Sequence, residues 1–162
     1  MNEMMQEIEI WNIIGNADQE NINQLLKEYY NETKYPGALY WIGIGYANIE
    51  NDMEQAVRYH KQAAKEGYRN SMTWLAEYYM NLSPDYLIDA EELIVQAIDL
   101  LDTEYVRFIQ AKIYLLEAIY YEELGKYKKA MNIIDDLYNK NYSLAINFVK
   151  IIESQEQLSL LS

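Results

Sequence analysis

The stretch Ala38-Leu39-Tyr40-Trp41-Ile42-Gly43, followed by Tyr46, decides the fold because a related stretch returns 33 residues later. There the chain reads Ser71-Met72-Thr73-Trp74-Leu75-Ala76 and then Tyr79. Alanines follow each stretch. Ala56 and Ala63-Ala64 follow the first, and Ala90 and Ala97-Ile98 occupy the corresponding positions 34 residues later. Self-similarity at such a period indicates stacked helix pairs, because one pair cannot bury its apolar face alone.

Outside these stretches, apolar residues also recur three and four residues apart, which is the helical period. Start and stop signals predict an all-α fold of eight or nine helices. The expected starts are Glu3, Asp18, Pro36, Asn51 or Asp52, Asn70, Pro84, Asp102 or Thr103, Tyr127 and Ser143. The first helix should end at Ile14 before Gly15, the second at Asn31, the fourth at Gly67, the seventh near Gly125 and the eighth at Asn139, while the last frays after Glu153.

The composition excludes several classes of protein. Two prolines and six glycines are too few for the frequent turns of an all-β fold. Because there is no cysteine, disulfides and thiolate metal sites are excluded. The chain begins with an acidic, interrupted segment rather than a secretory signal, and no apolar run approaches the roughly 18 residues of a membrane span. We therefore expect a soluble, cytoplasmic protein.

Two segments carry a resemblance to known repeats. Residues 56–67, read with Ala38, Ile42-Gly43 and Tyr46, closely resemble a SEL1-like repeat, and residues 114–137 look more like a tetratricopeptide (TPR) unit. The resemblance is strongest over residues 36–81, and the glycine-rich loop typical of SEL1 repeats is replaced by Ser83-Pro84-Asp85. It implies an α-solenoid, a right-handed array of stacked antiparallel helix pairs. Proteins of this family act mostly as scaffolds, adaptors and regulators.

On this interpretation the chain is a single repeat domain, residues 1–162. A capping helix pair would occupy residues 1–34 and the three repeats residues 35–67, 68–102 and 103–141. A capping helix and tail would follow over residues 142–162. Terminal pairs of such arrays are usually atypical because they cap the stack.

The sequence offers little for catalysis or for holding a metal or cofactor. His60 is the only histidine, so neither a histidine metal site nor a catalytic triad is expected, and we predict a packing or surface role for it. The neighbouring acids Glu91-Glu92, Glu122-Glu123 and Asp135-Asp136 point about 100° apart on a helix and cannot face one another. Gly43-Ile44-Gly45 is better explained by close helix packing than by nucleotide binding. We expect no enzymatic activity.

The formal net charge of −13 is unevenly distributed. Residues 68–102 contain seven acids and one base, and residues 1–37 seven acids and two bases, whereas residues 103–141 carry six of each. An acidic field repels nucleic acid and anionic lipid and attracts a basic protein. The alternative is that the acidity only keeps the protein soluble.

The helix that begins at Ser83-Pro84 concentrates this charge. At 100° per residue, Asp85, Asp89, Glu92 and Asp99 share one arc, with Gln96 among them. The opposite side carries Leu87, Ala90, Ile94, Ala97, Ile98 and Leu101. Like charges at this spacing disfavour a helix by a few tenths of a kcal/mol. Either a basic partner offsets that cost or the acids are a tolerated, solvated face.

A second candidate surface is the concave face that the resemblance implies. By the family pattern its outward residues are Tyr40, Ile44 and Asn48, then Thr73, Glu77 and Asn81, then Lys112, Leu115, Ile119 and Glu122. Trp41 and Trp74 are expected to pack inward. The seventeen tyrosines suit half-buried seams and binding surfaces, because the ring packs while the hydroxyl needs a polar partner.

Three functional hypotheses remain open at this point. The first is an immunity-type protein that binds and neutralises a basic toxin or nuclease. The second is a general adaptor that docks a peptide or helix in a concave groove, and the third an enzyme or an accessory subunit of one. The apolar tail Leu158 to Leu161 would also allow association with a neighbouring molecule.

Overall fold

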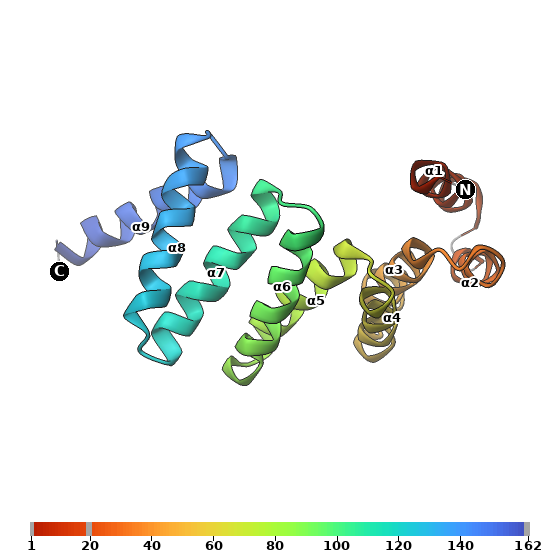
Figure 1. Ribbon diagram of the computed structural model, residues 1–162, viewed down its shortest axis with the longest axis horizontal. Coiled ribbons are helices and arrows are strands. Elements are labelled where there is room, and N and C mark those ends of the chain that lie inside the picture. The colour runs from red at the N-terminus through yellow and green to blue at the C-terminus, as the bar shows by residue number, and fades with distance from the viewer. Residues whose placement is uncertain (1, 19–20, 161–162) are drawn as a thin grey trace. The chain divides into compact units, whose positions relative to one another are not determined.

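The computed structural model describes residues 2–18 and 21–160, and every element within those ranges is helical (Figure 1). The α-helices are α1 (Glu3–Asn16), α2 (Ile22–Thr33), α3 (Pro36–Gly45), α4 (Met53–Lys65), α5 (Arg69–Leu82), α6 (Leu87–Leu100), α7 (Glu104–Tyr120), α8 (Leu124–Asn139) and α9 (Ser143–Leu160). A π-helical turn, η1 (Tyr46–Glu50), follows α3, and a 3₁₀ turn, η2 (Pro84–Tyr86), precedes α6. The all-α prediction is confirmed for the described residues. None of these helices combines the length and the apolar character that a membrane crossing needs.

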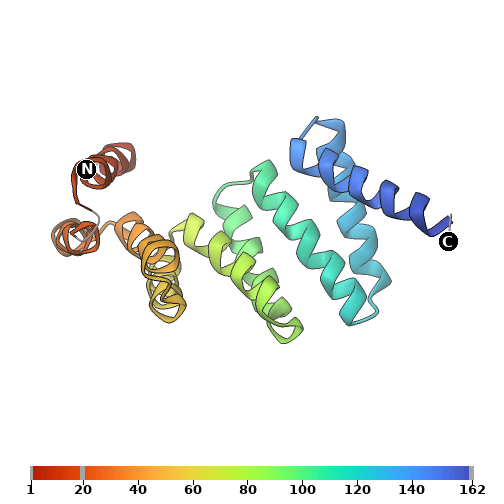
Figure 2. The same ribbon diagram turned by 180° about the vertical axis from the view of Figure 1, so that it is seen from behind.

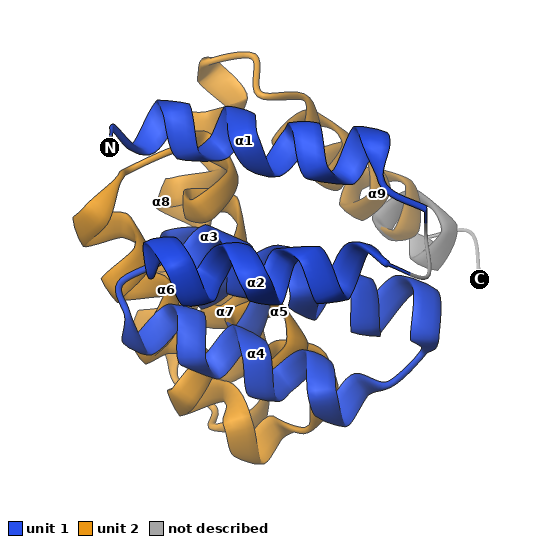
Figure 3. Ribbon diagram, turned by 90° about the vertical axis from the view of Figure 1, so that its right-hand side faces the viewer, with its two compact units in different colours: residues 1–75 blue, residues 76–162 orange. Residues whose placement is uncertain are grey.

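The chain divides into two compact units, Met1–Leu75 and Ala76–Ser162 (Figure 3). Helices that follow one another in sequence pack together within each unit: α2 with α3 and α3 with α4 in unit 1, α6 with α7 and α7 with α8 in unit 2. Figures 1 and 2 show α6, α7 and α8 side by side from opposite directions. The predicted packing of neighbouring helices is therefore confirmed. The solenoid that would stack all the pairs into one array remains a prediction.

Each unit has an apolar core built from the buried faces of its helices. In unit 1 the core contains Ile10, Leu26, Ala38, Leu39, Ile42 and Ala63. In unit 2 the largest buried side chains are Leu87 and Ile94 from α6, Ile109 and Ile113 from α7, and Ile134 and Leu137 from α8. Burying one Leu or Ile side chain stabilises a fold by about 1.5–3 kcal/mol. These residues fix which face of each helix is left for solvent or for a partner.

Local signals place several helix starts where the sequence predicts them. Pro36 occupies the first turn of α3, where its missing N–H loses no hydrogen bond. The Asp52 carboxylate accepts the backbone N–H of Gln55 at the start of α4, at 3.1 Å. The Thr103 hydroxyl accepts the N–H of Val106 at the start of α7, at 3.3 Å.

The boundary between α7 and α8 differs from the prediction. Helix α7 ends at Tyr120 rather than near Gly125, and Gly125 lies inside α8. The chain reverses at Glu122, whose φ of 56° is left-handed. Glycine is the usual residue in this conformation at the end of a helix, which is why Gly125 was expected to end α7. Here a non-glycine residue adopts it, which is uncommon.

Other helix ends also differ from expectation. Helix α2 starts at Ile22 rather than directly after Asp18, whose carbonyl accepts the N–H of Asn21 at 2.8 Å. Helix α5 starts at Arg69, so Asn70 lies inside it rather than capping it. Helix α9 continues past Glu153 to Leu160. The predicted docking of Leu158 to Leu161 concerns side chains outside the described residues.

Candidate protein-binding surface

Helix α6 buries one face and exposes the other. The fully buried residues are Leu87, Ala90, Ile94 and Ala97. The exposed carboxylates belong to Asp85 in η2 and to Asp89, Glu92 and Asp99 in α6. The predicted division of this helix is confirmed at these positions. It is wrong at Leu101, which lies beyond the helix end and is 53% exposed.

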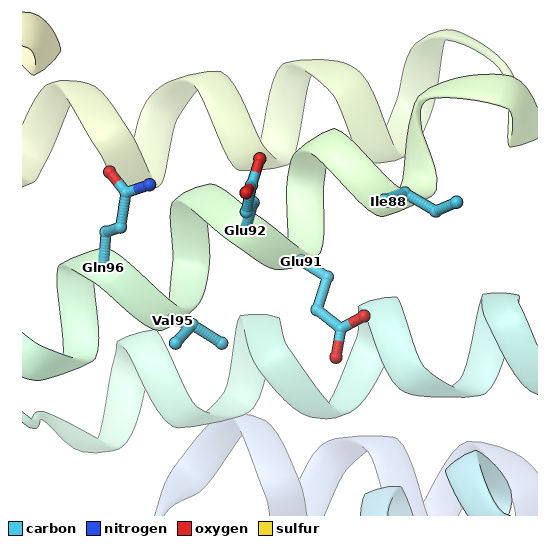
Figure 4. Close-up of a pocket in the computed structure, with 5 residues that line it drawn as sticks. All are labelled: Ile88, Glu91, Glu92, Val95 and Gln96. Atoms are coloured by element: carbon cyan, nitrogen blue, oxygen red, sulfur yellow. The ribbon is translucent and has the colours of Figure 1, made fainter.

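A shallow groove runs along the exposed face of α6, with a volume of about 340 Å³. Its lining residues are Ile88, Glu91, Glu92, Val95 and Gln96 (Figure 4). Glu92 and Gln96 project to one side of the helix, while Glu91 and Val95 project to the other (Figure 4). Ile88 is 64% exposed and Val95 is 38% exposed. Two aliphatic side chains thus lie in solvent among carboxylates.

Sequence reasoning missed Ile88 and Val95 as candidate site residues. The signal was present, because a rotation of 100° per residue places both within about 40° of the edge of the arc that the carboxylates occupy. The charge pattern of this arc alone does not reveal the apolar residues beside it. An exposed aliphatic pair beside acids has the composition of a docking surface rather than of a purely solvated face.

Most carboxylates of unit 1 that contact another side chain hold a tyrosine hydroxyl. Glu7 accepts the hydroxyls of both Tyr35 and Tyr68. The same contact joins Tyr29 to Glu9 and Tyr30 to Glu66, each at 2.7 Å, and in unit 2 Tyr105 to Glu77, also at 2.7 Å. These hydrogen bonds join residues that are 20 to 61 positions apart in sequence. They explain part of the unusual content of tyrosine and of acid without any partner.

The acids of α7 and α8 have internal partners of another kind. Arg107 pairs with Asp102, and Lys140 pairs with Asp136 at 2.7 Å. Lys126 contacts the carboxylates of both Glu91 and Glu117. In contrast, no Lys or Arg of the described residues lies within ion-pair distance of Asp89, Glu92 or Asp99. The exposed face of α6 is therefore negative without local compensation.

Lys126 pairs with Glu91, which lines one side of the groove. Its Nζ lies 2.9 Å from the Oε2 atom of Glu117, which is only 2% exposed, and 4.7 Å from the centre of the Tyr114 ring. Burial raises the pKa of Glu117, and the hydrogen bond from Lys126 opposes that rise. Lys126 thus pairs with the carboxylates of both Glu91 and Glu117. The side of the groove formed by Glu92 has no such cation and stays negative.

The residues of unit 1 that were expected to line a concave face are less exposed to solvent than predicted. Tyr40 is half-buried, and its ring contacts those of Trp41, His60 and Tyr68 with centroids 5.2–5.4 Å apart. Ile44 is half-buried, and Asn48 is exposed in η1. The outward placement of Thr73 is wrong, because its side chain is only 7% exposed and its hydroxyl donates to the Arg69 carbonyl.

In unit 2 the remaining candidates are scattered. Glu77 is half-buried and holds the Tyr105 hydroxyl, while the exposed Asn81 donates its amide to the Glu77 carbonyl at 2.7 Å. Glu122 is exposed in the turn between α7 and α8. That turn lies beside η2, because the Tyr121 hydroxyl donates to the Pro84 carbonyl at 2.9 Å. Of the predicted residues, only Asp85, Asp89, Glu92 and Asp99 form one continuous surface.

His60 has the packing role that the sequence predicts. It is fully buried, its ring stacks on Trp74 with centroids 3.9 Å apart, and its Nδ1 lies 3.2 Å from the Ser71 hydroxyl. Burial lowers its pKa to about 3. The neutral imidazole is therefore enclosed and has no access to a substrate in solvent.

The two glycines of Gly43-Ile44-Gly45 lie at close contacts between helices, as predicted. A β carbon on Gly43 would come within 2.7 Å of the His60 ring, and one on Gly45 within 2.7 Å of the Asn23 side chain.

Within the described ranges no three His, Cys, Asp or Glu side chains are grouped so as to hold a metal ion. Comparison of the chain with models of protein families, with curated proteins and with solved structures found no match.

Proposed function

We propose that this protein is a non-enzymatic protein-binding module, and that it captures and neutralises a basic protein as an immunity protein neutralises its toxin. The supporting observation is the uncompensated row of Asp89, Glu92 and Asp99 on α6. Several other acids, among them Glu7, Glu9, Glu66, Glu77, Glu91 and Glu117, hold tyrosine hydroxyls or a cation. Like charges along one helix face disfavour it by a few tenths of a kcal/mol per pair, and a cationic partner turns that repulsion into attraction.

The partner class follows from the sign of the charge. Proteins that bind nucleic acid are commonly cationic, because Lys and Arg neutralise phosphates. A toxic nuclease therefore presents the surface that an acidic inhibitor needs. Complementary fields would also speed the encounter, which suits a protein that must block its target before damage occurs.

The test is a comparison of two charge-reversal variants with equal net charge. The first carries D89K and E92K on α6. The control carries D135K and E153K, which reverse two exposed acids on α8 and α9. Partners are captured from a lysate of the native host, washed at low and then at high salt, and the retained basic protein is assayed for inhibition. We expect the α6 variant to lose at least about tenfold in inhibitory affinity, or about 1.4 kcal/mol, while the control stays close to wild type.

Equal losses in the two variants would mean that only net charge matters, and the α6 surface would then have no special role. If no basic protein stays bound through the high-salt wash, or if the retained protein keeps its full activity, the proposed neutralising function is wrong.

A general adaptor is the second candidate, supported by exposed apolar residues at the end of α7, where Ile119 is 70% exposed. It would be favoured if I119A or I44A weakened capture more than the α6 charge reversal.

A further inference from the structure

We propose that the segment docking in the α6 groove is an amphipathic α-helix of the basic partner, lying along α6 with a line of Arg or Lys on one side of its apolar stripe. This inference rests on the proposed function and deepens it by naming the form and chemistry of the partner's contact. Three features support it: the spacing of the exposed aliphatic residues, the absence of strand edges in the described fold, and the uneven charge of the two sides of the groove.

The spacing of Ile88 and Val95 favours a helix over an extended peptide. The two residues are seven positions apart on α6, which at 1.5 Å per residue is about 10.5 Å along the axis. Residues i and i+7 of a partner helix lie on one face with the same separation, so both contacts form at a small crossing angle. Side chains on one face of an extended chain repeat every 6.6–6.8 Å or so, and their spacing therefore does not match the groove.

The backbone of the described fold supports the same choice. An extended peptide gains most of its affinity by adding a strand to the edge of a sheet. All described elements are helices, whose backbone groups are already hydrogen-bonded within each helix. A partner helix satisfies its own backbone and needs only side-chain contacts, which is what the exposed face of α6 provides.

The two sides of the groove differ in charge, and this sets the position of the partner's cations. On one side Glu91 is already paired with Lys126. On the other side Glu92 has no cation, and Asp99 continues the acidic line one turn beyond Val95. Arginine is the best-suited residue here, because its guanidinium binds a carboxylate through two parallel hydrogen bonds. The partner helix should therefore carry cations along one edge of its stripe rather than along both.

A second copy of this chain is the less suitable occupant. Pairing two α6 faces about a two-fold axis would bring the acidic row of one copy, Asp89, Glu92 and Asp99, close to the same row of the other copy. Like charges facing one another across an interface are repulsive. A heterologous cationic helix has no such penalty.

The experiment uses the full chain and three synthetic 18-residue peptides, of which the first two have the same composition. The first is amphipathic, with Leu seven residues apart and Arg along one edge. The second is a permutation that spreads the same residues around the helix, and the third is the first peptide with its central residue exchanged for proline, which breaks the helix. Binding is measured by fluorescence anisotropy at low and at physiological salt, and peptide helicity by circular dichroism.

We expect the amphipathic peptide to bind at least about tenfold more tightly than the other two and to gain helicity on binding. I88S and V95S should each reduce its affinity towards that of the permuted peptide. I119S, which removes an equally exposed aliphatic side chain elsewhere in unit 2, should leave it unchanged. The three substitutions are at exposed positions, so thermal unfolding should show the same folded state for all.

Three results would overturn the inference: equal binding of the three peptides, indifference to I88S and V95S, or concentration-dependent self-association of the chain that is lost in I88S. The failure of the proposed function looks different. If the peptides are equivalent but D89K with E92K still abolishes inhibition of a basic protein, the partner helix is wrong and the neutralising function stands. If those charge reversals leave capture and inhibition unchanged, the function itself fails.

Discussion

His60 lies so close to Gly43 that a β carbon on residue 43 would come within 2.7 Å of its Nε2 atom. The imidazole has little room to give way, because it stacks on Trp74 and contacts the Ser71 hydroxyl. This contact joins α3 to α4, so the closeness of the two helices depends on a residue without a side chain at position 43.

We therefore expect G43A to destabilise the protein by about 1–3 kcal/mol, the usual cost of forcing an extra methyl group into a packed core. The loss should appear even though alanine is the better helix former by about 1 kcal/mol. Urea unfolding followed by circular dichroism measures it. G125A is the matched control, since nothing lies within 4 Å of a β carbon there and the change should be neutral or stabilising. Equal stability of the two variants would mean that His60 moves aside at little cost in free energy.

The buried His60 should also make stability depend on pH. Its pKa falls to about 3 in the folded state, against an ordinary value of 6.5, so between these values the unfolded chain binds a proton that the folded chain does not. The stabilisation is complete above pH 6.5 and is lost as the pH falls, at about 1.4 kcal/mol per pH unit well below 6.5. Urea unfolding between pH 7 and 5 tests this, because most carboxylates remain ionised there.

The control for this pH dependence is H60F, which keeps an aromatic ring but removes the titrating group. It should be less stable than wild type at pH 7, because the Ser71 hydroxyl loses its contact, yet its stability should vary less between pH 7 and 5. An unchanged slope in H60F would assign the acid sensitivity to other groups.

The helices and the buried face of α6 could be predicted from the sequence because both depend on local periodicity. Gly43 and Ala63 could be identified as packing positions because the repeat places small residues where helices approach. The end of α7 at Tyr120 could not be predicted, since the chain reverses at Glu122, a residue type that seldom adopts the left-handed conformation, and Gly125 offered a better stop signal.

The internal use of the acids was also beyond sequence reasoning. Tyr68 and Glu7 are 61 residues apart, and only the packing of α1 in unit 1 brings them together. Lys126 and Glu91 meet in the same way across α6 and α8. The sequence does not reveal which acids have internal partners, whereas the fold separates Glu7 and Glu91, which have them, from Asp89, Glu92 and Asp99.

Glu7 should hold α1 in place through its two tyrosines. Tyr35 and Tyr68 are 7% and 8% exposed, and both hydroxyls donate to the Glu7 carboxylate. E7A removes that acceptor, and each buried hydroxyl left without a partner costs about 1–3 kcal/mol. We expect faster hydrogen exchange of the α1 amides and a smaller effect for E7Q, which keeps one acceptor oxygen. N12A, at an exposed position of the same helix, should leave exchange nearly unchanged, and an equal effect of N12A and E7A would rule out this role for Glu7.

These tyrosines should also limit stability at alkaline pH. Burial, and then the hydrogen bond to Glu7, raise the pKa of both above the ordinary value of 10. The neutral phenols are therefore favoured by folding, so their contribution is complete below pH 10 and is lost as the pH rises beyond it. Unfolding between pH 9 and 11, with tyrosine ionisation followed by absorbance, should show destabilisation together with delayed ionisation. Ionisation of all tyrosines near pH 10 before unfolding would contradict this.

Lys126 should stabilise unit 2 mainly by compensating Glu117. The Glu117 carboxylate is almost fully buried, and Lys126 is the cation that contacts it among the described residues. K126M would leave a buried charge uncompensated, at a cost of about 3–5 kcal/mol at pH 7. The double variant K126M/E117Q removes the charge as well and should recover much of that loss. K140M breaks an exposed pair with Asp136 and should have little effect.

The pH dependence of K126M gives an independent check. Burial raises the pKa of Glu117, so folding favours its neutral form, and the penalty for the charged form grows as the pH rises above 4.5. Without Lys126 this rise in pKa should be larger, and the difference in stability between K126M and wild type should shrink as the pH falls from 7 towards 5. A difference that stays constant over this range would indicate that Lys126 acts through the contact of its ammonium group with the Tyr114 ring and not through the charge of Glu117.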